Sequence, residues 1–140
     1  MFVDHQSLRR RLRARPEILE AYLFGSQAHG GAQPHSDVDL AVYVDPERRL
    51  DCPFGYAAEL TADLVELLQS NDVDVVILNR APPLLYHRVL RDGLRLFTRD
   101  AQATTTREGR ALSRYCDYVP HLRKIDAAHA ARIENGSFGR

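Results

Sequence analysis

The chain has 140 residues, 44% of them hydrophobic and 27% charged, which is the size and composition of one soluble globular domain. Its formal net charge of zero argues against direct nucleic-acid binding driven by overall charge. No apolar run reaches the ~20 residues of a membrane helix, and the arginine-rich N-terminus lacks the apolar core of a signal peptide. Cys52 and Cys116 have no metal-ligand spacing and suggest no disulfide framework. From the length and these features together, we expect a single domain over residues 1–140 in the cytoplasm.

The first expected element is a short basic helix over residues 4–14, closed by Pro16. Leu8 and Leu12 form its apolar pair at i and i+4. Its arginines leave two interpretations open, a solvated helix face or a contact with phosphate or an acidic partner. A first strand is expected over residues 18–24.

The central segment is expected to combine turns with a second strand. Its expected elements are a short helix from Ser26 to about His29, a loop over residues 32–36, a strand over residues 38–44 and a turn-rich linker from Pro46 to Pro53.

The rest of the core shows helical and strand periodicity in alternation. We expect a helix over 57–69 with Leu60 and Leu64 in its apolar stripe, and then a strand over 73–78, a helix over 83–91 and a strand over 94–98. The core thus spans about residues 18–98.

A helical tail is expected over about residues 102–133, with its clearest periodicity up to Tyr118 and a kink or an interruption at Pro120. Its aromatic residues suit the core or a partner surface. The histidines His87, His121 and His129 are too far apart in sequence to suggest a ligand set, and we expect them at or near the surface.

The most informative motif pairs a glycine–serine turn with two acids. Gly25-Ser26 follows an apolar strand, and ten residues later Asp37-Val38-Asp39 opens the next strand. Side chains alternate along a strand, so Asp37 and Asp39 point to one side. Glycine lets a backbone approach phosphate closely, and carboxylates are Mg²⁺ ligands. The motif therefore predicts Mg²⁺ held between the protein and a nucleoside triphosphate.

The pattern GS-x10-DxD resembles the signature of the DNA polymerase β-like nucleotidyltransferase superfamily over about Ala21 to Leu78. The short chain is similar to the minimal nucleotidyltransferases, the antitoxin half of HEPN–MNT pairs. The resemblance implies an α/β (α+β) fold with a small mixed sheet flanked by helices. It also implies a third catalytic acid on a neighbouring strand. Asp74 matches the position of this third acid. An acid inside an apolar strand is costly unless it is paired or metal-bound, which supports the choice of Asp74. Asp72 is the alternative.

The resemblance implies two Mg²⁺ ions held by Asp37, Asp39 and Asp74, with ATP bound at Gly25 and Ser26. Gln27 and His29 depart from the family, in which arginine is common, and His35 is a loop residue or a γ-phosphate contact.

The implied activity is transfer of AMP to a tyrosine hydroxyl of a cognate HEPN ribonuclease toxin. The alternatives are a small-molecule (aminoglycoside-type) nucleotidyltransferase and a non-catalytic antitoxin that acts by binding alone.

Overall fold

The computed structural model describes residues 4–25, 37–48 and 55–134, with the side chains of 131–134 left out. Its sheet is mixed and has the strand order β3-β2-β1-β4. β1 lies antiparallel to β2 and β4, and β2 lies parallel to β3. The strands are β1 (Ile18–Phe24), β2 (Val38–Val44), β3 (Val73–Ile77) and β4 (Leu94–Thr98). They lie where the sequence predicts strands, and the α+β class is confirmed.

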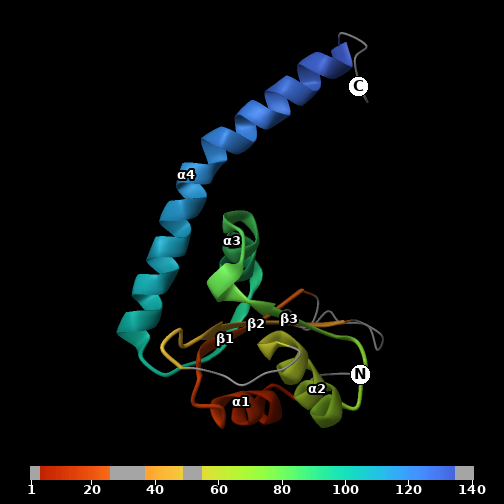
Figure 1. Ribbon diagram of the computed structural model, residues 1–140, viewed down its shortest axis with the longest axis vertical. Coiled ribbons are helices and arrows are strands. Elements are labelled where there is room, and N and C mark those ends of the chain that lie inside the picture. The colour runs from red at the N-terminus through yellow and green to blue at the C-terminus, as the bar shows by residue number, and fades with distance from the viewer. Residues whose placement is uncertain (1–3, 26–36, 49–54, 135–140) are drawn as a thin grey trace.

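Helices cover both faces of this sheet, with α1 and α2 on one side and α3 and α4 on the other (Figure 1). They are α1 (His5–Arg13), α2 (Tyr56–Leu68), α3 (Pro83–Asp92) and α4 (Ala101–Glu134), and the 3-10 turn η2 (Leu78–Arg80) follows β3. The short helix predicted from Ser26 and the loop up to residue 36 lie outside the described residues.

The core under α1 and α2 uses the predicted apolar stripes. Leu8 and Leu12 of α1 and Leu60 and Leu64 of α2 are fully buried against the sheet. The arginines of this region partly serve the fold, because Arg11 and Arg15 form ion pairs with Asp63 of α2. These two side chains therefore make a contact within the fold, which neither interpretation of the basic helix included.

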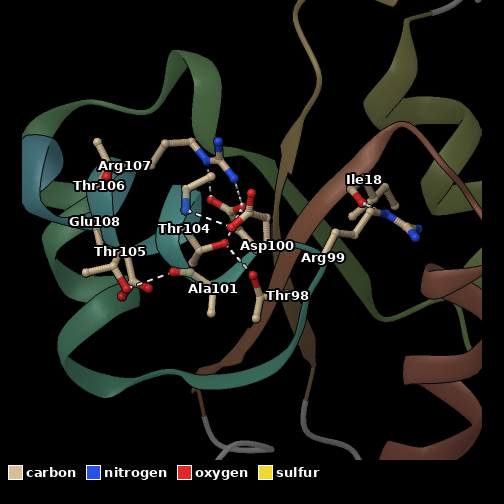
Figure 2. A network of polar contacts seen from close by, with 12 residues as sticks. Ile18, Thr98, Arg99, Asp100, Ala101, Thr104, Thr105, Thr106, Arg107 and Glu108 are labelled. Atoms are coloured by element: carbon tan, nitrogen blue, oxygen red, sulfur yellow. Dashed lines mark hydrogen bonds and ion pairs between the residues drawn. The ribbon is translucent and has the colours of Figure 1, made fainter.

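The core under α3 and α4 contains a buried ion pair that the sequence pattern does not predict. Glu20 of β1 is fully buried, and Arg107 of α4 donates to its two oxygens over 2.7 and 2.5 Å. Thr104 donates to Glu20 over 2.9 Å and also contacts Thr98 of β4. Figure 2 shows Arg107 and Thr104 reaching this network from the first turns of α4. The pair therefore ties α4 to the middle of the sheet.

The tail forms one continuous helix, so an interruption at Pro120 is wrong. Pro120 is exposed, and water can reach the backbone carbonyl that a proline leaves unpaired. Figure 1 shows α4 bending along its length and extending beyond α3. None of the described helices combines the length and hydropathy that a membrane-spanning segment needs.

Candidate active site

Three strand ends bring the predicted acids to one place. Phe24 at the end of β1 is the register partner of Asp39 in β2, and Gly25 follows directly. Asp39 is also the parallel register partner of Asp74 in β3. Register partners in neighbouring strands project to the same face, so Asp39 and Asp74 share one face of the sheet. Asp37 directly precedes β2 and lies two residues from Asp39.

Gly25 lies directly against Asp39. Its φ of +76° is in the left-handed region, which side chains other than glycine adopt at a cost. A Cβ atom at this position would lie 2.3 Å from the Oδ2 atom of Asp39. The glycine therefore provides both the backbone conformation and the space that this carboxylate occupies.

We expect Gly25→Ala to lower the free energy of unfolding by about 1–2 kcal/mol through the backbone alone, and to impair nucleotidyl transfer because Asp39 must move. Gly55→Ala is the matched control, since Gly55 has a φ of +92° but no atom within 4 Å of the position that a Cβ would take. Urea unfolding and a transfer assay measure the two effects. Equal loss of transfer in both variants would contradict a specific contact with Asp39.

Burial and the charges of two neighbouring acids act together on Asp39. Asp39 is half-buried, and its pKa is raised, first by desolvation and then by the charges of Asp74 and Asp37. Asp37 is exposed. A bound cation would relieve this repulsion and favour the ionised form of Asp39.

The burial cost that drew the sequence analysis to Asp74 does not arise, but Asp74 is still the neighbour of Asp39 because the two are register partners. Asp74 is exposed, because β3 is an edge strand with no fully buried residue. Asp72, the alternative, is also exposed, and its backbone carbonyl accepts a hydrogen bond from the Val38 N–H over 2.7 Å. Its backbone therefore helps to set the start of β2.

The donor chemistry of the site fits Mg²⁺. Within residues 4–25, 37–48 and 55–134, no group of three His, Cys, Asp or Glu side chains is placed to hold a metal ion. Mg²⁺ in nucleotide enzymes is usually bound by one or two carboxylates together with substrate phosphates and water, so a three-ligand protein cluster is not required. The Asp39 and Asp74 carboxylates, which lie on one face of the sheet, meet that requirement.

Ser26, which is predicted to bind the triphosphate, and the residues between it and Asp37 lie outside the described part of the chain, so the structure does not place them. Among them are Gln27, His29, His35 and Ser36.

The histidines and tyrosines of the helices lie elsewhere. The rings of His87 on α3 and Tyr115 on α4 stack with centroids 3.6 Å apart and an angle of 3° between their planes. Tyr118 and His121 form a tilted pair on α4 with centroids 6.1 Å apart. The stack joins α3 to α4, which is a packing role within the fold.

Residues 6–102 match the family described as Polymerase beta, Nucleotidyltransferase. This span covers more than half of the chain, and the chain therefore belongs to that family of nucleotidyltransferases. A comparison with curated protein sequences found no match.

The solved structures that share this fold include chains of toxin–antitoxin complexes. One, a toxin–antitoxin with AMP-PNP, is 28% identical with a TM-score of 0.74, over 90% of this chain and 98% of that chain. Another, the MNT antitoxin with tri-AMPylated HEPN toxin of Shewanella oneidensis, is 27% identical with a TM-score of 0.66, over 89% and 94%. A third, MntA–HepT, is 25% identical with a TM-score of 0.56, over 94% of each chain. The chain thus resembles the MNT antitoxins of HEPN–MNT pairs.

Proposed function

We propose that this protein is an antitoxin that transfers AMP from ATP to a tyrosine hydroxyl of a cognate HEPN toxin, with Mg²⁺, and so inactivates the toxin. The observation that carries the proposal is the meeting of Asp39 with Gly25 on one side and with its register partner Asp74 on the other. Membership of the nucleotidyltransferase family supports the reaction class.

Each residue of the site has a role in this reaction. Asp37, Asp39 and Asp74 would hold Mg²⁺, which when bound neutralises charge on the phosphates. Gly25 and Ser26 would hold the triphosphate through their backbone N–H groups. The exposed carboxylate of Asp74 is free to accept the proton of an incoming hydroxyl, whose pKa of about 10 otherwise keeps it protonated at neutral pH.

The transfer exchanges one phosphorus–oxygen bond for another. The tyrosine oxygen forms a bond to the α-phosphorus of ATP, and the bond from that phosphorus to the bridging oxygen breaks. Pyrophosphate leaves, and the hydroxyl proton passes to Asp74. Because β3 is the edge strand, Asp74 lies where a large protein acceptor can reach it.

The choice of a HEPN toxin as acceptor rests on similarity. Solved chains of 27–28% identity come from a toxin–antitoxin with AMP-PNP and from a complex of MNT antitoxin with tri-AMPylated HEPN toxin. These neighbours support ATP as donor and a protein as acceptor.

The test uses the purified full-length protein, Mg²⁺, ATP labelled at the α-phosphate and the product of the adjacent gene. We expect label on a tyrosine of that product, and none with the Asp37→Ala/Asp39→Ala variant. Label transferred to an aminoglycoside without a protein partner would favour small-molecule transfer. Neutralisation of the toxin by the double variant would favour an antitoxin that acts by binding alone.

A further inference from the structure

A pocket lies on the sheet face covered by α3 and α4, further along β2 than the acids. Its volume is about 130 Å³. Tyr43, which contributes to it from β2, is four residues along the strand from Asp39, or roughly 13 Å at the rise of a strand. The polar residues of its lining are Tyr43, Asn79, Tyr86, Arg107, Arg110 and Arg114.

The pocket carries a surplus of positive charge. Arg107, Arg110 and Arg114 lie at i, i+3 and i+7 on one face of α4. The charge of Arg107 is balanced by Glu20. In the described part of the chain, Arg110 and Arg114 form no ion pair, and nearby Glu108 already pairs with Arg95 over 2.9 Å. Two guanidinium groups therefore remain unbalanced at this pocket.

A buried hydroxyl also lacks a partner here. Tyr86 of α3 is 3% exposed, and its hydroxyl has no hydrogen-bond partner among the described residues. Burial raises the pKa of this phenol, so it stays protonated and can donate. Asn79 is already committed, because its side chain exchanges two hydrogen bonds with the Val44 backbone over 2.9 and 2.7 Å. The free groups of the pocket are thus mainly donors, the buried Tyr86 hydroxyl and the exposed Arg110 and Arg114, and they suit a ligand that accepts hydrogen bonds.

The volume and the charge of the pocket together limit the kind of ligand that it can bind. Pockets for whole small molecules have volumes of about 300–1,000 Å³, so this one has room for a single group but not for a nucleoside. Arginine forks suit oxyanions, and two unbalanced charges match a phosphate dianion better than a carboxylate.

We propose that this pocket is a binding site for one phosphate group, separate from the nucleotidyl-transfer site, held by Arg110, Arg114 and the Tyr86 hydroxyl. Two sources share this chemistry, the free ion and the terminal group of a nucleotide whose base and sugar stay outside. The experiment therefore compares inorganic phosphate, AMP and acetate at constant ionic strength.

The measurement is NMR of the arginine Nε–H groups in the full-length protein. We expect inorganic phosphate to shift the signals of Arg110 and Arg114 saturably, and acetate to do so at least tenfold more weakly. A response to AMP as strong as that to phosphate would assign the site to a nucleotide end, and a response to phosphate alone would assign it to the free ion. No saturable shift, or an equal response to acetate, would overturn the proposal.

Matched variants locate the site. Arg110→Ala/Arg114→Ala should weaken phosphate-dependent thermal stabilisation at least tenfold in apparent affinity. Arg123→Ala/Lys124→Ala removes the same charge from an exposed stretch of the same helix and should leave the response unchanged. Equal weakening in the two double variants would mean that phosphate binding depends only on the net charge of the protein, and this would overturn the proposal.

Tyr22 provides a matched control for the Tyr86 hydroxyl. Tyr22 is also 3% exposed and has an unpartnered hydroxyl among the described residues, but it does not line the pocket. Tyr86→Phe should weaken phosphate binding several-fold, whereas Tyr22→Phe should not. Asp39→Asn should leave phosphate binding intact, which separates this site from the acids. Weakening by Tyr22→Phe as strong as by Tyr86→Phe would contradict a direct contact with the Tyr86 hydroxyl.

Discussion

Asp39→Asn is expected to reduce nucleotidyl transfer more than about a hundredfold while making the metal-free protein more stable at neutral pH. Loss of groups that merely support a metal ligand costs about 10–100-fold, so loss of a central ligand should cost more. The gain in stability follows from removing a half-buried carboxylate that is repelled by Asp37 and Asp74.

The pH dependence of this gain follows from the raised pKa of Asp39. A carboxyl whose folded pKa lies above its unfolded value binds more protons in the folded state, so its charge destabilises the fold as pH rises. Below the ordinary value of 3.8 both states are protonated, and the variant should match the wild type. Its advantage should appear as pH rises through the folded pKa of Asp39 and persist to neutral pH.

Thermal unfolding at pH 3 and pH 7, with and without Mg²⁺, measures the change in stability. The assay with labelled ATP measures the change in transfer. Mg²⁺ should stabilise the wild type more than Asp39→Asn, because binding to the folded state alone raises stability. Asp72→Asn is the control, since Asp72 is an exposed acid before β3 that we do not place in the site. Full transfer activity in Asp39→Asn would reject the assignment of the site. Loss of activity in Asp72→Asn would move the third acid from Asp74 to Asp72.

Arg107→Met is expected to lower the free energy of unfolding by about 3–5 kcal/mol, because it leaves the fully buried Glu20 carboxylate without its counter-charge. Domains of this kind have a total stability of about 5–15 kcal/mol, so the loss is a large share. Since Glu20 is the anchor of α4 on β1, the start of α4 should also lose hydrogen-exchange protection.

Two variants test the reason for this loss. Arg95→Met breaks an ion pair in which the Arg95 side chain is 44% exposed and that of Glu108 is 29% exposed. This variant should lower the free energy of unfolding by only about 0–1 kcal/mol. Glu20→Met/Arg107→Met should recover most of the stability, because apolar side chains can replace a buried ion pair at little cost. Urea unfolding gives all three values. A cost for Arg107→Met no larger than that for Arg95→Met would show that the buried charge is not the cause.

The basic helix at the N-terminus shows how similar residues acquire different roles. Arg11 and Arg15 bind Asp63, and Arg9 donates to the Leu96 carbonyl over 2.5 Å. These contacts join α1 to α2 and β4. The sequence displayed the cluster of arginines, but their partners are distant in the chain, at separations that local periodicity does not address.

Local pattern was sufficient for the elements and for the centre of the candidate site. Strands 18–24, 38–44 and 94–98 were predicted with the bounds observed, because their apolar runs end at turn residues. The spacing of Gly25 and Asp39 was also informative by itself. The strand that ends at Gly25 and the strand that contains Asp39 are joined by a connection short enough for the two to pair side by side as antiparallel strands. The approach of Gly25 to Asp39 confirms that they are neighbours.

Only the tertiary structure decided which acid is buried. Glu20 and Asp74 both stand inside apolar strands, and the sequence pattern drew attention to Asp74 alone. Strand order places β1 in the interior of the sheet, under α4, and β3 at its edge. Glu20 is therefore enclosed and paired with Arg107, whereas Asp74 is exposed. Alternation along a strand tells which side chains share a face, but burial depends on which strands and helices, distant in sequence, pack against that face.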